Sequence, residues 1–178
     1  MTQNGLSYSQ VGAFAEAHVT AELLAYGYDV LKPTIGSARY DLAIILADRL
    51  LRLQVKLATI KEGSIRFSCT TANGAKKTKT SYVGDCELIV GYCPENGSAY
   101  AIRPEDAPTN LVSLRITPSR NDQKRSIRWA EDHRLKSMLA QLESEAGGIA
   151  VLSARDMDSD SKRPGKRSAK KPKLVATA

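Results

Sequence analysis

Three polar side chains interrupt two apolar segments in "ARYDLAIILADRLLRLQVK", residues 38–56. Asp41 opens the first apolar segment, and Gln54 and Lys56 lie near the end of the second. A carboxylate within an apolar strand costs free energy unless it is paired, bound to a metal ion or exposed to water at the strand end. For Asp41 considered alone, exposure at the start of a strand is the simpler interpretation.

Gln54 and Lys56 change this interpretation because their spacing places them on one face of a strand. Residues two apart in a strand point to the same side, so Val55 points the other way, into the core. The break at residues 47–49 predicts a hairpin, which sets residues 54–56 opposite residues 41–43. The carboxylate, the amide and the amine are therefore expected to converge at the open end of this hairpin.

An acid, a carboxamide oxygen and an amine together predict metal-assisted chemistry on a phosphate ester. Mg²⁺ prefers oxygen ligands and usually takes few from the protein, with water and substrate phosphate completing the set. Asp41 and Gln54 supply such oxygens, and Mn²⁺ is an alternative to Mg²⁺. Lys56 would not bind the metal ion. It would hold or help deprotonate the attacking water and offset phosphate charge.

Glu16 is a fourth candidate, on a helix predicted to run from a cap at Ser7 or Ser9 to Gly27. Glu16 borders the buried face of this helix, so packing against the sheet could direct it toward Asp41. The alternative is an ordinary solvated glutamate. The apolar residues of the helix that recur at helical spacing are Val11, Phe14, Ala15, Val19, Leu23 and Tyr26.

Several strand-like segments and one further helix follow. The closing helix, within residues 129–145, carries Leu135, Met138, Leu139 and Leu142 on one face, and Trp129 is expected in the core. A polar, basic loop is expected over residues 71–85, and another over residues 118–128. The predicted strands lie in residues 28–33, 40–46, 50–60, 64–70, 86–93, 98–104 and 110–116.

The order of helix, strands and helix predicts an α+β domain with a mixed central β-sheet flanked by helices. We assign residues 1–146 to this domain and residues 147–178 to a disordered basic tail. The net charge of +7 lies in the last part of that tail, because residues 161–178 hold seven Lys or Arg and no acid, whereas residues 1–160 are formally neutral. Such a tail can attract phosphates without sequence preference, or it can simply aid solubility.

The chain is expected to act in the cytoplasm. No apolar run approaches the roughly 18 residues that span a bilayer, and "MTQNGLSYSQ" lacks the pattern of a signal peptide. Cys69, Cys86 and Cys93 show no CxxC spacing. They are expected to be free, buried thiols in a reducing compartment.

The order and spacing of six short strings resemble the PD-(D/E)xK nuclease superfamily, in its branch of group I intron-encoded homing endonucleases. The strings are "AELLAYGYDVLKP", "RYDL", "LLRLQVK", "SYVGD", "GYCPE" and "IRWAEDHRL", within residues 10–135. The resemblance implies an α/β nuclease-type core that cleaves DNA phosphodiesters with Mg²⁺. It aligns Glu16 with the helix acid, Asp41 with the motif acid, Gln54 with the acid-or-glutamine position and Lys56 with the catalytic lysine.

The sequence departs from the motif at two positions. Tyr40 replaces the proline of the motif name, and Gln54 replaces the second acid. A carboxamide still offers an oxygen ligand but brings no negative charge, so the metal site would depend on Asp41, Glu16 and the Val55 carbonyl. Glutamine is accepted at this position in the homing branch. Glu87 stands where the branch often has an aspartate, and we expect only a structural role for it.

The two basic loops are the expected DNA contacts. Lysine, arginine and hydroxyl side chains suit phosphates, whereas Arg, Asn and Gln can read bases. Solvated loops without a role are the alternative interpretation. The candidate DNA-binding residues are Lys76, Lys77, Lys79, Arg120, Lys124, Arg125 and Arg128.

These observations predict a Mg²⁺-dependent DNA endonuclease acting on double-stranded DNA, similar to homing endonucleases. Cutting both strands suggests a homo-oligomer, a dimer or a tetramer. One alternative is a non-catalytic DNA-binding protein that keeps the nuclease fold, which Gln54 and the basic tail would also fit. Another is a nuclease for branched DNA or RNA.

Overall fold

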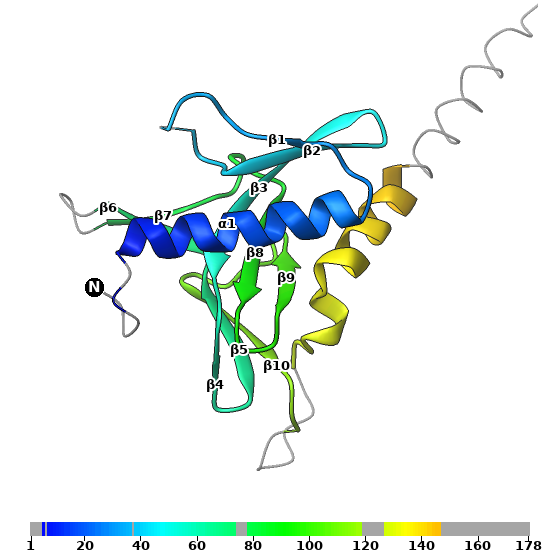
Figure 1. Cartoon of the computed structure of the whole chain (residues 1–178). Coiled ribbons are helices and arrows are strands. Elements are labelled where there is room, and N and C mark those ends of the chain that lie inside the picture. The colour runs from blue at the N-terminus through cyan, green and yellow to red at the C-terminus, as the bar shows by residue number, and fades with distance from the viewer. Residues whose placement is uncertain (1–4, 6, 37, 74–77, 119–126, 147–178) are drawn as a thin grey trace, which may run out of the picture.

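The structure is a computed structural model of the 178-residue chain that describes residues 5, 7–36, 38–73, 78–118 and 127–146 (Figure 1). The predicted tail, residues 147–178, lies outside the described residues. Two helical segments and ten strands build the described part, with a short 3₁₀ turn at Glu131–His133. This arrangement is the α+β class with a mixed sheet that the sequence predicts.

Helix α1 (Tyr8–Ala25) begins at a capping box. The Ser7 hydroxyl accepts from the Gln10 amide at 3.2 Å, and the Gln10 side chain accepts from the Ser7 amide at 2.8 Å, which satisfies backbone donors at the helix start. The helix ends before Gly27, whose φ of 91° is in the left-handed region.

The buried face of α1 is narrower than its apolar spacing predicts. Ala15, Val19 and Leu23 are buried, whereas Phe14, which shares their helical spacing, is 42% exposed. The Phe14 ring packs edge-on against His18 and Tyr92, with centroids 4.5 and 5.9 Å away. It covers the border of the helix–sheet contact rather than its interior.

The central sheet has five strands in the order β1-β2-β3-β8-β9. Strands β3 and β8 are parallel, and every other neighbouring pair is antiparallel, which confirms the mixed sheet. The strands are β1 (Val30–Leu31), β2 (Leu42–Leu46), β3 (Arg49–Leu57), β8 (Leu88–Cys93) and β9 (Ser98–Ile102).

The hairpin between β2 and β3 turns in two residues, Ala47 and Asp48, which have φ values of 48° and 60°. Positive φ at both central residues is the type I′ geometry, whose twist matches that of the flanking strands. The turn is one residue shorter than the break read from the sequence. Its register pairs Leu42 with Leu53 and Ala43 with Arg52, so residues 41–43 lie opposite residues 52–54 rather than 54–56. A shift of two residues leaves each side chain on the face that was predicted.

A second sheet, in the order β10-β5-β4, packs on the other side of the central sheet. The run predicted over residues 50–60 is divided between two sheets, because β3 ends at Leu57 and a new strand begins at Thr59. Ala58, fully buried, lies at the break. The three strands are β4 (Thr59–Lys61), β5 (Ser64–Ser68) and β10 (Leu111–Arg115).

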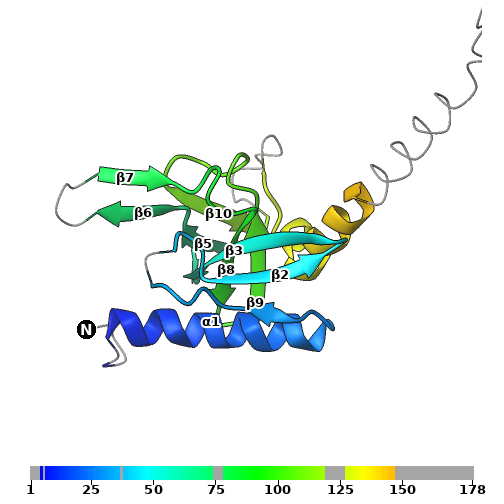
Figure 2. The same cartoon turned by 90° about the horizontal axis from the view of Figure 1, so that it is seen from above.

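A two-stranded hairpin occupies most of the segment predicted as a polar loop over residues 71–85. Strands β6 (Thr70–Asn73) and β7 (Thr78–Ser81) pair antiparallel, with Thr71 opposite Thr80. β-branched threonines favour extended backbone, a signal that the lysines and glycine of the segment obscured. The hairpin projects from the body of the molecule, on the far side of the sheet from α1 (Figure 2).

Two apolar cores lie on the two faces of the central sheet. Helix α1 and the closing helix, residues 135–146, cover one face, and Leu135, Met138 and Leu139 of the latter are buried there as predicted. The second sheet covers the other face, in a core that contains Phe67 and Tyr100.

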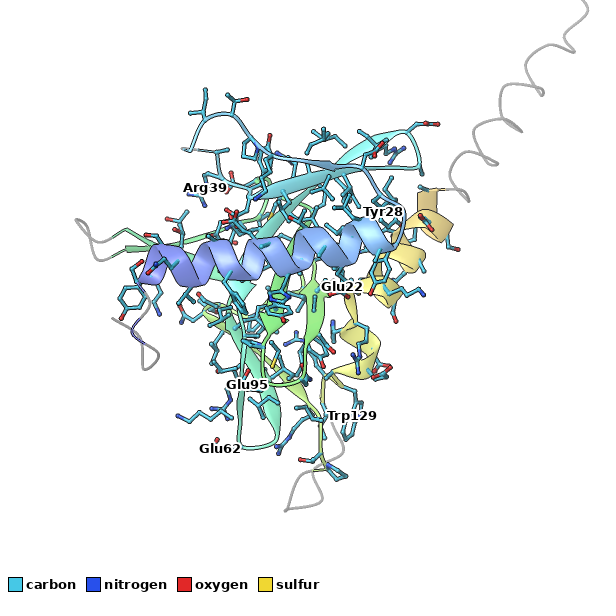
Figure 3. The ribbon with its side chains drawn as sticks, in the orientation of Figure 1. Glu22, Tyr28, Arg39, Glu62, Glu95 and Trp129 are labelled. Carbon is cyan, nitrogen blue, oxygen red and sulfur yellow. The ribbon has the colours of Figure 1, made fainter. Side chains whose placement is uncertain are left out.

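The segment before the closing helix differs from its prediction. Trp129 is 38% exposed and lies outside the core, at the lower end of the molecule in Figure 3. Its neighbour Ala130, 6% exposed, occupies the core position instead, because the bridge of Trp129 with Arg115 directs the chain along the sheet edge.

All three cysteines are free and buried, as predicted. Among the described residues, no helix is long and apolar enough to cross a membrane.

Gly91 of β8 provides a test of the packing beneath β3. A Cβ at this position would lie 2.6 Å from Cγ of the buried Phe67 ring, so we expect Gly91→Ala to destabilise the protein by about 1–3 kcal/mol. A Cβ added at Gly12 in α1 would have no atom within 4 Å. Gly12→Ala is therefore expected to stabilise the protein by about 0.5–1 kcal/mol. Urea unfolding of both variants measures the difference. Equal effects would contradict the close approach at Gly91.

Candidate active site

Asp41 is fixed at the open end of the β2–β3 hairpin by three hydrogen bonds. Its backbone amide donates to the Leu53 carbonyl at 2.9 Å. Its Oδ2 accepts from the Val55 amide at 2.7 Å and from the Gln54 side-chain amide. The carboxylate and the carboxamide are thus in direct contact, although 13 residues separate them in the sequence.

Burial distinguishes this carboxylate from an ordinary one at a strand end. Gln54 is only 7% exposed, and Asp41 lies beside it. Burial raises the pKa of the Asp41 carboxyl above its ordinary value, and the nearby charge of Glu16 acts in the same direction. The Val55 amide, Lys56 and Gln54 favour the ionised form and lower this pKa in turn.

Lys56 shares the face of β3 that carries Gln54. Leu53 and Val55 point the other way, into the core beneath α1, which follows from the alternation of side chains along a strand. The Lys56 amine lies 5.0 Å from the centroid of the Tyr82 ring. Among the described residues it forms no ion pair with a carboxylate.

These side chains surround one open cavity of about 310 Å³ on the face of the sheet opposite α1. Asp41, Gln54 and Lys56 all line it. The remaining lining residues come from three other parts of the chain and are Ala38, Arg39, Thr71 and Tyr82.

Glu16 does not line this cavity. Its carboxylate reaches close enough to raise the pKa of Asp41. It also pairs with Lys32, with Nζ and Oε2 3.4 Å apart. Glu16 therefore acts on Asp41 through its charge, and its place in a metal site remains a prediction. Lys32 is a neighbour of Glu16 that sequence reasoning missed.

Arg39 and Tyr82 were also missed, although "RYDL" and "SYVGD" contain them. Arg39 donates from Nε to Asp85 at 2.7 Å and from Nη2 to the Ser81 carbonyl at 2.8 Å. Figure 3 labels Arg39, on the side from which the β6–β7 hairpin projects. The signal available in the sequence was the position of Arg39, two residues before the motif acid, but nothing local revealed its partner.

Glu87 has the structural role that was expected. It accepts from the Arg52 backbone amide at 2.6 Å and from the Arg52 Nη2 at 2.6 Å. Burial alone would raise the pKa of Glu87, but the hydrogen bonds from Arg52 hold this pKa below its ordinary value. The pair joins β3 to the start of β8 and lies away from the cavity.

Two of the seven predicted DNA-binding residues belong to the described part of the chain. Lys79 is exposed on β7. Arg128 is exposed and donates to the Asp106 carbonyl at 2.9 Å. The other candidates, which lie outside the described residues, are Lys76, Lys77, Arg120, Lys124 and Arg125.

The donor set around Asp41 fits a hard divalent cation. Asp41, Gln54, the Val55 carbonyl and Glu16 each carry an oxygen, the type of ligand that Mg²⁺ and Mn²⁺ take. The side-chain nitrogen of Gln54 faces Asp41 and lies 3.5 Å from the Val55 carbonyl oxygen. A rotation of the Gln54 carboxamide by about 180° would direct its oxygen to a cation beside Asp41 instead. Within the described residues no three acidic, histidine or cysteine side chains cluster, so water and substrate would complete such a site.

A family model described as PD-(D/E)XK endonuclease matches residues 6–136. The chain belongs to this family. Nucleases of this family generally use divalent metal ions. The matched span includes all four predicted site residues and the whole central sheet.

Among solved structures, the chain is similar to a bacterial homing endonuclease, I-Ssp6803I. The TM-score is 0.63 and the sequence identity is 23%, over 79% of this chain and 97% of that one. This likeness shows that the two share a fold. A comparison with curated proteins finds no match.

The raised pKa of Asp41 predicts how stability responds to pH. Below the ordinary pKa of an aspartate, the folded and unfolded states are both protonated, so no penalty arises. As pH rises through the raised value of the folded state, the buried charge costs stability. Asp41→Asn removes this cost while its oxygen still accepts from the Val55 amide.

We therefore expect Asp41→Asn to raise the melting temperature at pH 7 and to leave it nearly unchanged at pH 3.5. Scanning calorimetry at both pH values measures this. Added Mg²⁺ should stabilise the wild type more than the variant, because the variant lacks the charged ligand. A variant that is less stable than the wild type at pH 7 would contradict the assigned cost.

Proposed function

We propose that this endonuclease-family chain hydrolyses phosphodiester bonds of double-stranded DNA with Mg²⁺. The observation that supports the proposal best is the convergence of Asp41, Gln54 and Lys56 on one open cavity. A carboxylate, a carboxamide oxygen and an amine there can hold a metal ion, a water molecule and a phosphate. The family match and the shared fold agree with this chemistry.

Asp41 and Gln54 would hold the ion, together with the Val55 carbonyl and Glu16. Bound Mg²⁺, or Mn²⁺ in its place, would neutralise phosphate charge and lower the pKa of a water molecule. The Val55 amide keeps Oδ2 of Asp41 in position. Because Asp41 is half-buried and its pKa is already raised by the charge of Glu16, a neutral ligand at residue 54 avoids a third negative charge.

Lys56 would position the attacking water and donate a hydrogen bond to a phosphate oxygen. It is on the same face of β3 as Gln54 and lines the cavity. No carboxylate among the described residues forms an ion pair with it, although its charge lowers the pKa of Asp41, so a substrate phosphate can approach the amine.

The β6–β7 hairpin would contact the duplex beside the cavity. Lys79 and Thr80 are exposed on β7, and Thr71 of β6 lines the cavity itself. A two-stranded ribbon fits the major groove of B-DNA, where hydroxyls and amines meet phosphates and base edges. Arg128, with the predicted Lys76, Lys77, Arg120, Lys124 and Arg125, would add phosphate contacts.

We further propose homing-endonuclease-like cleavage by a homo-oligomer, a dimer or a tetramer, because one cavity cuts one strand at a time. The action would be cytoplasmic, where the three free thiols stay reduced. Residues 147–178, proposed as a separate basic tail after the domain of residues 1–146, would add affinity that is independent of DNA sequence.

Cleavage of supercoiled plasmid DNA tests the proposed function. The wild type is expected to nick and linearise the plasmid with Mg²⁺ and not with EDTA. Asp41→Ala and Lys56→Ala are each expected to slow cleavage by at least about 100-fold, because each removes a group that stabilises the reacting phosphate. Asp29→Ala and Lys61→Ala, exposed residues of the same types outside the cavity, serve as controls.

The competing functions predict different results in this assay. A wild type that binds duplex DNA and cuts none of the substrates would identify a non-catalytic DNA-binding protein. Preferential cutting of a four-way junction or of RNA over linear duplex would identify a nuclease for branched DNA or RNA. If both site variants cut as fast as the wild type, the assigned residues are wrong.

A further inference from the structure

The Lys56 amine has an aromatic partner at the place where a carboxylate would usually hold it. It lies 5.0 Å from the Tyr82 ring centroid, within the range of a cation–π interaction. The described part of the chain offers it no ion pair. Asp41, whose pKa the Lys56 charge lowers, is near enough to attract the amine but forms no ion pair with it. The ring is therefore the side chain over which this amine lies in the absence of substrate.

Tyr82 is itself rigidly placed. Its side chain is 3% exposed and belongs to the core between the two sheets. Its carbonyl accepts from the Asp85 amide at 2.9 Å and from the Cys86 amide at 3.3 Å, which closes a tight turn. Gly84, with φ of 82°, supplies the left-handed residue of this turn.

Arg39, another residue that lines the cavity, stabilises the same turn. Its guanidinium carbon lies 5.4 Å from the Tyr82 ring centroid. It also holds both ends of the turn, through the Ser81 carbonyl and the Asp85 carboxylate. Two cations thus lie over one buried ring, but Arg39 is neutralised by Asp85 and Lys56 has no such partner.

We propose that Tyr82 is a positioning residue for Lys56, an inference that rests on the proposed nuclease function. The face of the ring attracts the amine toward the cavity without neutralising it, because a π-system carries no net charge. A carboxylate in this position would hold the amine but cancel the charge that the substrate needs. The phenolic hydroxyl has no part in this role.

Three substitutions separate the ring from the hydroxyl and from general packing. Tyr82→Phe keeps the ring, and Tyr82→Leu replaces it by an apolar side chain without a π face. Tyr100→Leu is the matched control. Tyr100 is 2% exposed, and the guanidinium carbon of Arg134 lies 5.4 Å from its ring centroid. Tyr100 belongs to β9, and no residue of β9 lines the cavity. Tyr82→Met replaces the leucine variant if that variant fails to fold.

The first measurement is single-turnover plasmid cleavage with Mg²⁺, together with duplex affinity in EDTA. We expect Tyr82→Phe to cut within about twofold of the wild type and Tyr82→Leu to cut about tenfold more slowly at unchanged affinity. Tyr100→Leu is expected to lose as much thermal stability as Tyr82→Leu while keeping its cleavage rate. A Tyr82→Leu variant that cuts as fast as the wild type overturns the proposal.

The second measurement does not depend on activity. Reductive methylation with ¹³C-formaldehyde leaves lysines charged, and the Lys56 signal is assigned by its loss in Lys56→Arg. Ring currents should shift this signal upfield in the wild type and in Tyr82→Phe, but not in Tyr82→Leu. An unshifted signal in the wild type overturns the proposal. A shifted signal in a protein that cuts no DNA refutes only the proposed function and leaves the ring as the partner of Lys56.

Discussion

The pairing of β2 with β3 is the constraint on which the candidate site depends. A two-residue turn fixes this register, and the register brings Asp41 to Gln54 and to the Val55 amide. A slip of one residue would turn every β3 side chain to the opposite face. It would place Val55 in the cavity and bury the Lys56 amine beneath α1. The buried apolar residues on the α1 face of β3, Leu51, Leu53 and Val55, oppose such a slip and so protect the site.

The charges of the site follow from the burial of Asp41. One backbone amide and one carboxamide donate to its carboxylate, and Glu16 approaches without joining the cavity. A second carboxylate at the buried position 54 would face the half-buried Asp41 directly, and the two negative charges would repel each other. Glutamine supplies a donor to the free protein and an oxygen to a cation. The departure from the family motif is therefore compatible with the geometry around it.

Local sequence patterns predicted most of the fold, and they failed where local and tertiary preferences differ. The helix caps, the β2–β3 hairpin and the closing helix follow from spacing and turn residues. The β6–β7 hairpin was read as a loop because its polar composition concealed the β propensity of threonine. Phe14 and Trp129 are apolar but lie at the borders of the two cores, and spacing cannot tell a border from an interior.

The sequence by itself determined which chemical groups the site contains and that Gln54 and Lys56 share a face, because side chains alternate along a strand. It also predicted that Asp41 lies near them, because a short hairpin joins the two strands, whereas the register was fixed by the two-residue turn that only the structure shows. Only the tertiary structure decided that Tyr82 and Arg39 enclose the cavity and that Lys32 reaches Glu16. These contacts join segments that no turn or periodicity connects, and they form only when two sheets and a helix pack together.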